Sequence, residues 1–404
     1  MSQTEPPSWW SSEDLKYCSG ELYFGSRCLR EIAEGGTPVY VLRPQRAVEN
    51  LRKLQKAVPD FSIYYAIKAN RHPFIASGLK NAGISGIDVC SPREAELALS
   101  YGFRPEQISY TGTSLSRSDL DFLYSVPGIH VNADSLAALR RILAGNSGKK
   151  NVRREIGIRI NPELGLGYHQ ESRLVYSGQD QISKFGILHE QIENAIKLAD
   201  LYGAAITTVH WHVGCGWLSE QLDQAEKVVQ RGMEMAEQFP NLQQINMGGG
   251  LGVPLAEEDP EMDLADWGQR VRRLNRDRWK MRIEPGAFLV QNSTVLLIEI
   301  CTVEEKRGTW FLGINSGFNL LIEPVFYGMP SEAVPLRIAD PNKSEYPCRF
   351  AGNINEAHDM LPQTVNIPLP KEGDFFALLN AGAYGTSMSS HHCLRQCSRE
   401  FVVD

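Results

Sequence analysis

A lysine closes an apolar segment early in the chain, at a position that allows chemistry. In the stretch 64–70 (YYAIKAN), Lys68 follows a run of residues that is typical of a buried strand. Because unpaired buried charge is costly, such a lysine either extends to the surface or lies in a site that lowers its pKa. In a site of the second kind the free amine can form a Schiff base. The surface alternative is the commoner one for a single lysine, so other residues must decide.

Other polar residues lie within or directly after later apolar segments of the same kind. They are Asp88, Arg159, Asn161, His212, the glycines 248–250 and Glu284. Each has an ordinary alternative: His210 and His212, two apart on a strand, could bind a metal or simply be polar residues at a barrel mouth. Consecutive glycines let backbone N–H groups approach an anion closely. Together the set supplies an amine for an aldehyde, a phosphate cradle, an imidazole and a carboxylate, which are the groups needed to hold pyridoxal phosphate (PLP).

The segments that carry these residues alternate with amphipathic helical patterns. Strands are expected at 62–67, 87–90, 108–111, 129–132, 156–160, 206–213, 244–247 and 281–284. Helices are expected between them, at 73–82, 92–101, 116–124, 135–143, 188–201, 220–239 and 263–274. This rhythm over about 250 residues predicts a (β/α)8 TIM barrel, with catalytic residues at the carboxyl ends of the strands. A doubly wound sheet is the alternative, but its first turn needs a glycine-rich fingerprint that residues 68–70 lack.

The pattern changes after Glu284. Segments 293–302, 309–314, 349–351 and 374–379 have the character of strands separated by turns, without long helices. Residues 37–42 predict a further strand and 44–58 a helix. We therefore expect a PLP-binding barrel over residues 38–288 and a C-terminal β domain over residues 289–404. The N-terminal segment, residues 1–37, is expected to pack with the β domain.

Composition and charge exclude several functional classes. The 404 residues are 42% hydrophobic and 22% charged, as in an ordinary globular protein. The net charge of -7 argues against nucleic acid or an anionic membrane surface as a partner. No apolar run approaches the roughly 20 residues of a membrane-spanning helix, and residues 1–10 lack the features of a secretory signal. The eight scattered cysteines indicate reduced thiols, so we expect a cytoplasmic protein.

Possible metal ligands gather near the C-terminus, at His391, His392, Cys393 and Cys397. No second Cys/His pair stands nearby at the spacing of a zinc site, so we predict no metal.

Short motifs follow one another through the chain in a specific order. They are YYAIKAN, GIDVCSPREAEL, IRINP, SKFGI, HWHVG, NMGGGLG, EPG, NSGFNLLIEPVFYG, AGNINEAHD and NAGAYG. In content and spacing they resemble the motifs of the diaminopimelate/ornithine decarboxylase family, PLP-dependent enzymes of the alanine-racemase-like fold type III. The resemblance extends from about Pro38 to Gly385. It implies a decarboxylase that binds pyridoxal 5'-phosphate, acts on a small-molecule amino acid, and forms a homodimer with shared active sites.

The resemblance also implies roles for individual residues. Lys68 would carry the cofactor as a Schiff base, His212 would stack on its ring, and Glu284 would pair with the pyridine nitrogen. A carboxylate there keeps the nitrogen protonated and makes the ring a strong electron sink, whereas the related alanine racemases have an arginine. Glu284 therefore favours decarboxylation. The other residues expected at the cofactor are Gly249, Gly250 and Tyr384 at the phosphate, with Asp88, Arg159 and Cys215, the last in place of a usual serine.

One motif departs from the family at a residue linked to catalysis. The family pattern Cys-Glu-Ser-x-Asp is replaced by residues 355–359 (NEAHD). The family's cysteine comes from the partner subunit and is linked to protonating the carbon after decarboxylation. The amide of Asn355 has no proton to give at neutral pH. Either His358 or water takes over this step, or the outcome of the reaction differs.

Two further departures concern the substrate. Where diaminopimelate decarboxylases have two arginines for the substrate's distal carboxylate, this chain has Ala287 and Glu323. Like charges at such a site cost several kcal/mol, so a distal carboxylate should be rejected. A pocket that keeps Tyr327 and contains Glu323, Glu356 and Asp359 is expected to prefer a cationic end, such as an amine or guanidinium. Alternatively, Glu323 points to solvent and Ala287 makes room for a bulkier substrate.

Two other functions are also compatible with these residues. Asn355 would also suit an amino-acid racemase or epimerase on the same scaffold. A catalytically silent binding protein is the other possibility, but such proteins tend to lose cofactor residues, whereas Lys68, His212, Glu284 and Tyr384 are all present.

Overall fold

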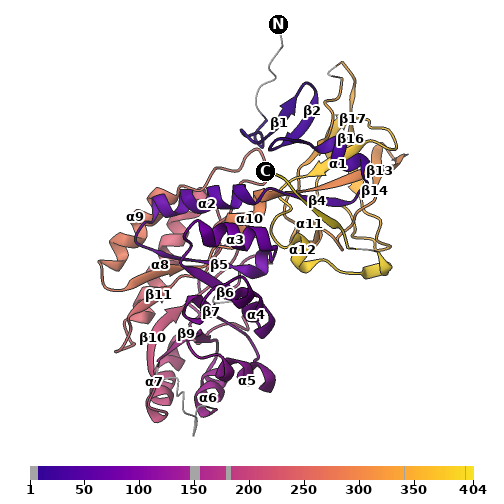
Figure 1. Ribbon diagram of the computed structural model, residues 1–404. Helices are drawn as coiled ribbons and strands as arrows, with labels where there is room; N and C mark the ends of the chain where they lie inside the picture. Colours follow the sequence, from indigo (N-terminus) through magenta and orange to yellow (C-terminus); the bar gives the residue numbers. More distant parts are fainter. Residues whose placement is uncertain (1–7, 146–154, 179–182, 341, 396) are drawn as a thin grey trace. The chain divides into compact units, whose positions relative to one another are not determined.

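The structure is a computed structural model that describes residues 8–145, 155–178, 183–340, 342–395 and 397–404. The chain divides into two compact units (Figure 1). The barrel unit consists of Val48–Val253 and Pro260–Leu289. The β unit consists of Met1–Ala47, Pro254–Asp259 and Val290–Asp404.

The barrel unit is built on eight parallel strands that close into a barrel (Figure 1). In chain order they are β5 (Ser62–Ala66), β6 (Gly86–Val89), β7 (Ile108–Tyr110), β8 (His130–Ala133), β9 (Glu155–Arg159), β10 (Ala205–His210), β11 (Gln244–Asn246) and β12 (Lys280–Ile283). Closure comes from the pairing of Ile283 in β12 with Ile63 in β5. Each strand overlaps one that the sequence predicted, and the TIM-barrel prediction is confirmed.

Helices alternate with these strands. They are α2 (Pro44–Ala57), α3 (Pro73–Asn81), α4 (Pro92–Ser100), α5 (Arg117–Ser125), α6 (Leu136–Ala144), α7 (Ile192–Leu201), α8 (Leu222–Ala236), α9 (Leu264–Asn275) and α10 (Ala287–Val290). Serine caps fix where three of them begin, because the hydroxyls of Ser91, Ser116 and Ser135 each accept a backbone N–H of the first turn. Such a cap contributes about 1 kcal/mol to helix stability.

The β unit contains a sheet with the strand order β15-β18-β13-β14-β16-β17, to which β4 attaches by pairing with β13, and β19 by pairing with β4. Its strands are β4 (Val39–Leu42), β13 (Thr294–Lys306), β14 (Thr309–Ile314), β15 (Ala333–Pro335), β16 (Glu345–Ala351), β17 (Val365–Pro368), β18 (Phe375–Leu378) and β19 (Arg399–Val402). The short helices α11 (Ile322–Tyr327) and α12 (Gly385–Met388) belong to the same unit. The predicted C-terminal β domain is confirmed.

A small three-stranded sheet completes the β unit, formed by β1 (Leu15–Cys18), β2 (Glu21–Phe24) and β3 (Arg27–Cys28) and followed by α1 (Leu29–Glu34). Leu22, Phe24 and Leu29 are buried in one core with Leu297 and Ala377 of the large sheet. These strands of two to four residues are too short to give a clear alternation in the sequence, which explains why they were missed.

The division between the units differs from the expected boundary at residue 38. Strand β4 pairs with β13, Leu42 opposite Thr294, and with β19, so it belongs to the β unit. The chain enters the barrel unit through helix α2, at Val48, and not through a strand. The sequence showed an apolar strand at this position but not its partner.

Among the described residues, no helix combines the length and apolar character that crossing a membrane requires.

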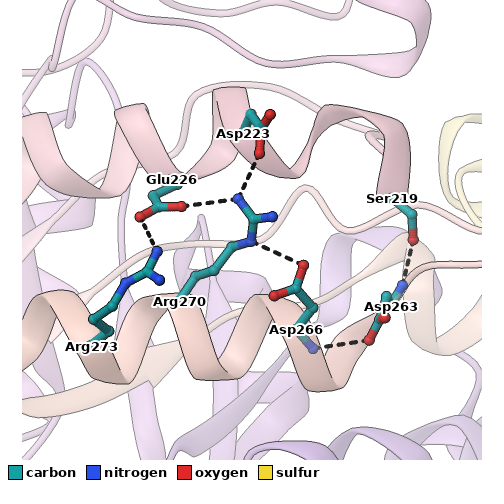
Figure 2. Close-up of polar contacts among 7 residues, drawn as sticks. All are labelled: Ser219, Asp223, Glu226, Asp263, Asp266, Arg270 and Arg273. Carbon is teal, nitrogen blue, oxygen red and sulfur yellow. Dashed lines mark hydrogen bonds and ion pairs between the residues drawn. The ribbon is translucent and has the colours of Figure 1, made fainter.

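A network of ion pairs joins α8 to α9 on the barrel unit (Figure 2). The guanidinium of Arg270 lies 2.7 Å from Asp223, 2.9 Å from Glu226 and 3.0 Å from Asp266. Arg273 adds a second contact to Glu226, at 2.5 Å. Single exposed ion pairs contribute little, but one cation shared by three carboxylates connects two helices that are neighbours only in the tertiary structure.

We expect the substitution Arg270→Met to lower the midpoint of thermal unfolding, because it leaves three carboxylates close together without their cation. The loss should be largest at low ionic strength and much smaller in about 1 M NaCl, where charges are screened within a few ångströms. Differential scanning calorimetry at both salt concentrations measures it. Arg273→Met, which removes one contact instead of three, is the matched control and should have a smaller effect. An equal loss at both ionic strengths would contradict the electrostatic explanation.

Candidate active site

Lys68 lies in a single turn of 3-10 helix, Ile67–Ala69, that directly follows β5. The strand register places Ala66 opposite Asp88 of β6, so these two neighbouring strands deliver Lys68 and Asp88 to one end of the barrel. The pKa of Lys68 is raised, by Cys90 first and also by Asp88 and Glu284, against the opposing effect of burial. The expectation that this site lowers the lysine pKa is therefore wrong for the free protein, because acidic groups surround the amine.

Asp88 and Cys90 are the acidic groups nearest to this lysine along the neighbouring strand. Burial, followed by the proximity of Glu284, raises the pKa of Asp88 well above its usual range. Its Oδ1 is buried and has no hydrogen-bond partner among the described residues. Burial raises the pKa of the Cys90 thiol to about 12, and the charge of Lys68 opposes that rise. The sequence analysis had not singled out Cys90, although it directly follows β6.

Glu284 follows β12 directly and is held by three side chains from other strands. Ser109 Oγ donates to Oε1 at 2.8 Å, and Asn246 Nδ2 donates to the same oxygen at 2.6 Å. His210 Nε2 lies 3.2 Å from Oε2. Burial alone would raise the pKa of Glu284, but His210 and these hydrogen bonds hold it below its usual range. Burial lowers the pKa of His210, and the neighbouring Glu284 opposes that effect.

The polar contacts continue across the barrel interior. Asn132 Nδ2 donates to Ser109 Oγ at 3.3 Å and to Thr111 Oγ1 at 2.9 Å. A Cβ at Gly157 would overlap Asn132 Oδ1, so the neighbouring strand needs a glycine there. Sequence reasoning missed Ser109, Asn132 and Asn246, and gave His210 no role at the carboxylate. The available signal was a polar residue interrupting an apolar strand, which the triplet Ile108–Tyr110 shows.

His212 lies two residues beyond the end of β10, although the sequence predicted it within that strand. Its ring packs edge-on against Tyr176, with the ring centroids 5.5 Å apart. Burial first, and then the charges of Lys68 and Arg159, lower its pKa well below the usual range, so the ring is neutral. Its Nδ1 is buried and has no hydrogen-bond partner in the part of the chain that the structure describes.

Arg159 ends β9 and supports His212 from its neighbouring strand. Its Nη2 donates to the carbonyl oxygen of His212 at 3.1 Å. The guanidinium lies over the ring of Phe185, 4.1 Å from the centroid, and Phe185 belongs to the SKFGI motif. Burial lowers the pKa of Arg159, but an arginine remains charged at physiological pH. The Arg159 guanidinium thus contacts two of the sequence motifs, HWHVG through His212 and SKFGI through Phe185.

The glycines 248–250 lie where no side chain fits. A Cβ at Gly249 would come 2.5 Å from the carbonyl oxygen of Glu284, and one at Gly250 would come 2.7 Å from that of Gly214. Gly250 also has φ of +114°, which strains any other residue. Among the described residues, the amides of Gly249 and Gly250 have no hydrogen-bond partner. Cys215 follows Gly214, is buried, and donates its amide to Leu174.

These features fit a bound PLP. The uncovered amides of Gly249 and Gly250 suit a phosphate, and the unpartnered polar atoms of Asp88 and His212 suit polar groups of a ligand. An ionised carboxylate at Glu284 suits a protonated pyridine nitrogen. All of these residues come from the barrel unit, as the sequence predicted from the strand ends.

Glu323 lies on α11 in the β unit and is 4% exposed, so the alternative that it points to solvent is wrong. Gln291 Nε2 donates to its Oε2 at 2.9 Å. Burial, opposed by this hydrogen bond, raises the pKa of Glu323 to about 7. The side chain is therefore shared between its neutral and charged forms at neutral pH, and is not the permanent anion that the sequence suggested. Tyr327 ends the same helix, half-buried against Phe326.

Asp359 has a different role from the one predicted. Its two carboxylate oxygens accept the backbone amides of Phe318 and Ile354, each at 2.7 Å. Burial raises its pKa, and both amides oppose that effect. A Cβ at Gly352 would overlap the same carboxylate. We therefore assign Asp359 to the structure of the loop 352–359 and not to substrate binding.

The tip of this loop, residues 355–358, is exposed, so Asn355 and His358 both face solvent in the single chain. Glu356 pairs with His392 of the C-terminal segment at 3.3 Å. In the same segment, His391 Nε2 lies 3.6 Å from Cys397 Sγ. The described residues contain no group of three or more side chains that could hold a metal ion.

Two more of the predicted residues lie at the ends of short helices. Ala287 is the first residue of α10, in the barrel unit, and Tyr384 is the N-cap of α12, in the β unit. Tyr384 has a left-handed backbone with φ of 58°.

We expect Asn246→Leu to raise the pKa of Glu284 and to lower the free energy of unfolding by about 1–3 kcal/mol, because a buried carboxylate loses a donor. The sign follows from the depressed pKa. Glu284 stabilises the fold above the pH at which an unfolded glutamate titrates, about 4.3, and this stabilisation disappears as the pH falls. Urea unfolding over a pH series measures both effects.

Asn275→Leu is the matched control, because Asn275 is a buried amide that donates to the Trp279 carbonyl and contacts no carboxylate. Its loss of stability should not depend on pH. A pH-independent loss for Asn246→Leu as well would show that Glu284 is not the group affected.

Comparisons with known proteins agree with this geometry. Residues 45–291 match a family model described as "Pyridoxal-dependent decarboxylase, pyridoxal binding domain". The chain is 31% identical to the diaminopimelate decarboxylase of Methanothermobacter thermautotrophicus, over 95% of this chain and 91% of that protein. Its fold is similar to that of a protein from Aquifex aeolicus, with a TM-score of 0.82, 29% identity, and coverage of 96% of this chain and 92% of that one.

The fold is also similar to that of the arginine decarboxylase of Paramecium bursaria Chlorella virus, with a TM-score of 0.79. The two share 18% identity over 93% of this chain and 98% of that one, a likeness of fold alone. The family match covers the barrel strands that carry Lys68, His212 and Glu284. The chain belongs to the pyridoxal-dependent decarboxylase family, and it is an enzyme that decarboxylates an amino acid with pyridoxal 5'-phosphate as its cofactor.

Proposed function

We propose that the substrate is an amino acid, or an amino-acid conjugate, whose distal group is cationic. The observation that carries this proposal is the buried Glu323, a carboxylate whose described hydrogen-bond partner is the neutral amide of Gln291. A buried carboxylate gains most from a cation, and an amine or guanidinium supplies one with directed hydrogen bonds. Ala287, in place of the family's other arginine, carries no charge and little volume. A second carboxylate on the substrate would find no cation at either position.

In the proposed site, Lys68 holds the cofactor covalently and His212 packs against its ring. When bound, PLP supplies an electron sink for the bond to the departing carboxyl group. The raised pKa of Lys68 means that its amine is an ammonium in the free protein and would have to give up a proton in order to hold the cofactor covalently. Of the two carboxylates that influence this amine, Asp88, whose pKa is raised well above its usual range, is the one suited to receive that proton, whereas Glu284 stays ionised. The neutral His212 ring adds no positive charge to the stacked ligand.

Glu284 favours decarboxylation over racemisation in this proposal. His210, Asn246 and Ser109 hold its pKa below the usual range, so it stabilises a protonated pyridine nitrogen and hence the electron sink. Asn355 is the residue that suggested a racemase, but it has no bearing on the protonated pyridine nitrogen that makes the ring an electron sink. For the final protonation we assign His358, the imidazole of the tip 355–358, because the side-chain amide of Asn355 has no proton to give.

We further propose a homodimer in which the exposed tip 355–358 enters the site of the partner subunit. Its support is the position of the tip, which is exposed in the single chain while the base of its loop is fixed by the Asp359 carboxylate. A rigid base with a polar, exposed tip suits a contact outside its own chain.

Borohydride reduction of the PLP-loaded enzyme, followed by peptide mapping, should place the cofactor on Lys68, since the amine follows β5 at the strand end. Lys68→Ala should remove turnover and leave the fold intact by circular dichroism. Lys80→Ala is the control, because Lys80 is held by the carbonyl of Gly102 and should keep full activity. Label on any other lysine would overturn the assignment.

The selectivity for a cationic group should depend on pH. Because the pKa of Glu323 is about 7, the carboxyl is neutral below that pH and charged above it. The KM for L-lysine or L-ornithine should therefore fall as the pH rises through this range, by roughly tenfold for one charged hydrogen bond. Glu323→Gln should give a flat profile. Release of carbon dioxide from a panel of D- and L-amino acids measures the preference and also tests decarboxylation itself.

The double substitution of Ala287→Arg with Glu323→Arg is the complementary test. It should weaken the use of lysine-like substrates and strengthen diaminopimelate binding. Equal turnover of diaminopimelate and basic amino acids by the unmodified protein would contradict the charge argument and favour pocket volume instead.

Mixing two inactive variants tests the shared site. Lys68→Ala and Glu356→Ala, after subunit exchange, should regain part of the activity, because one of the two sites in the heterodimer has an intact barrel and an intact tip. Lys68→Ala mixed with Glu284→Ala is the control and should stay inactive, since both changes affect the same barrel. No recovery in the first mixture, with exchange verified, would show that each site is formed by a single chain or that Glu356 is dispensable.

A further inference from the structure

Gln291 connects three segments of the β unit through one buried side chain. It is 4% exposed, and its Nε2 donates both to Glu323 Oε2 and to the carbonyl oxygen of Asn380, each at 2.9 Å. The main-chain carbonyl oxygen of Gln291 accepts a hydrogen bond from the backbone N–H of Gly382, also at 2.9 Å. Asn380 and Gly382 belong to the NAGAYG motif, which also contains Tyr384. One glutamine therefore contacts both the motif of Tyr384 and the carboxylate of α11.

We propose that Gln291 is a positioning residue that determines substrate specificity, because it fixes the Glu323 carboxylate relative to the turn 380–384 and leaves its charge available to the substrate. This inference deepens the proposed function and rests on it. Neither the motifs nor the strand-end pattern identified Gln291.

The geometry around Gln291 restricts its position. A Cβ at Gly382 would overlap the carbonyl oxygen of Val290, so the turn and the backbone beside Gln291 pack without space between them. Asn380 has a left-handed backbone, φ of 56°, and its Nδ2 donates to Pro254 O at 3.3 Å. The Gln291 amide nitrogen makes two hydrogen bonds, while its Oε1 is buried and has no partner among the described residues. Glu323 is then held at Oε2.

The chemistry of the amide explains why a glutamine suits this place. An arginine or lysine would orient Glu323 but would also neutralise it, and a substrate cation would then gain little. An amide orients the carboxylate and carries no charge. In the described part of the chain, burial and the Gln291 hydrogen bond are the two influences on the titration of Glu323, with no contribution from a charged side chain. Burial raises the Glu323 pKa, and the Gln291 donor opposes that rise.

The first measurement needs no substrate. The difference in unfolding free energy between the wild type and Glu323→Gln, followed over pH, reports the titration of Glu323 in the folded protein. The same comparison is then made with Gln291→Met added to both proteins. This change removes the hydrogen-bond donor and keeps a side chain of similar volume. We expect the midpoint to move upward by about one pH unit, the loss of one hydrogen bond to a charged group. Asn315→Leu is the control, because Asn315 donates to Thr37 in the same unit and should leave the midpoint unchanged.

The second measurement uses L-lysine and its uncharged analogue L-norleucine as probes. Gln291→Met should raise the KM for L-lysine by roughly tenfold at pH 7 and leave kcat/KM for L-norleucine unchanged. An unmoved titration midpoint would overturn the inference whatever the activity. A moved midpoint with unchanged selectivity would uphold the pairing of Gln291 with Glu323 and overturn the cationic pocket instead. If Gln291→Met does not fold, the double variant Gln291→Leu with Glu323→Leu replaces it, and a stable double variant that still prefers L-lysine contradicts the inference.

Discussion

A buried carboxylate inside a barrel is the constraint on which the rest of the barrel unit depends. Glu284 is held in its ionised form by His210, Asn246 and Ser109, which come from three other strands. An unpaired buried charge would cost several kcal/mol, so the identity of each donor is tied to the carboxylate. Asn132 then holds Ser109, and Gly157 must lack a side chain to admit Asn132. Apolar side chains usually fill the interior of such a barrel. The polar residues inside this one are explained by the charge of Glu284.

The reactive lysine depends on the same interior. Its pKa is raised, because the groups that would bind the cofactor are acidic in the free protein and favour the ammonium. The rim above β10 and β11 is built differently, from backbone atoms. Gly249 and Gly250 lie so close to neighbouring carbonyl oxygens that a Cβ cannot be added, and their amides stay uncovered. Around Lys68, side chains determine the charge of the site. At Gly249 and Gly250, backbone amides form the cradle that suits a phosphate.

Two carboxylates buried in the β unit, Asp359 and Glu323, are stabilised in different ways. Asp359 has both oxygens occupied by backbone amides, so its charge is used within the loop 352–359. Glu323 has one oxygen occupied by the neutral amide of Gln291, and the pKa of about 7 shows how weakly its charge is stabilised. A group in this state responds strongly to a nearby cation. The same residue type is therefore structural in one place and suited to recognition in the other, and the difference lies in its donors.

The sequence by itself determined the fold class, because eight apolar runs alternating with amphipathic helices bury their faces in few ways other than a TIM barrel. It also located Lys68, His212, Glu284 and the glycines, since a polar residue at the end of an apolar strand is visible in one dimension. Only the tertiary structure decided which residues hold Glu284, because Ser109, His210 and Asn246 come from three different strands. It also decided that β4 pairs outside the barrel and that Asp359 is structural. Burial and hydrogen-bond partners fix the charge of a side chain, and neither is set by its neighbours in sequence.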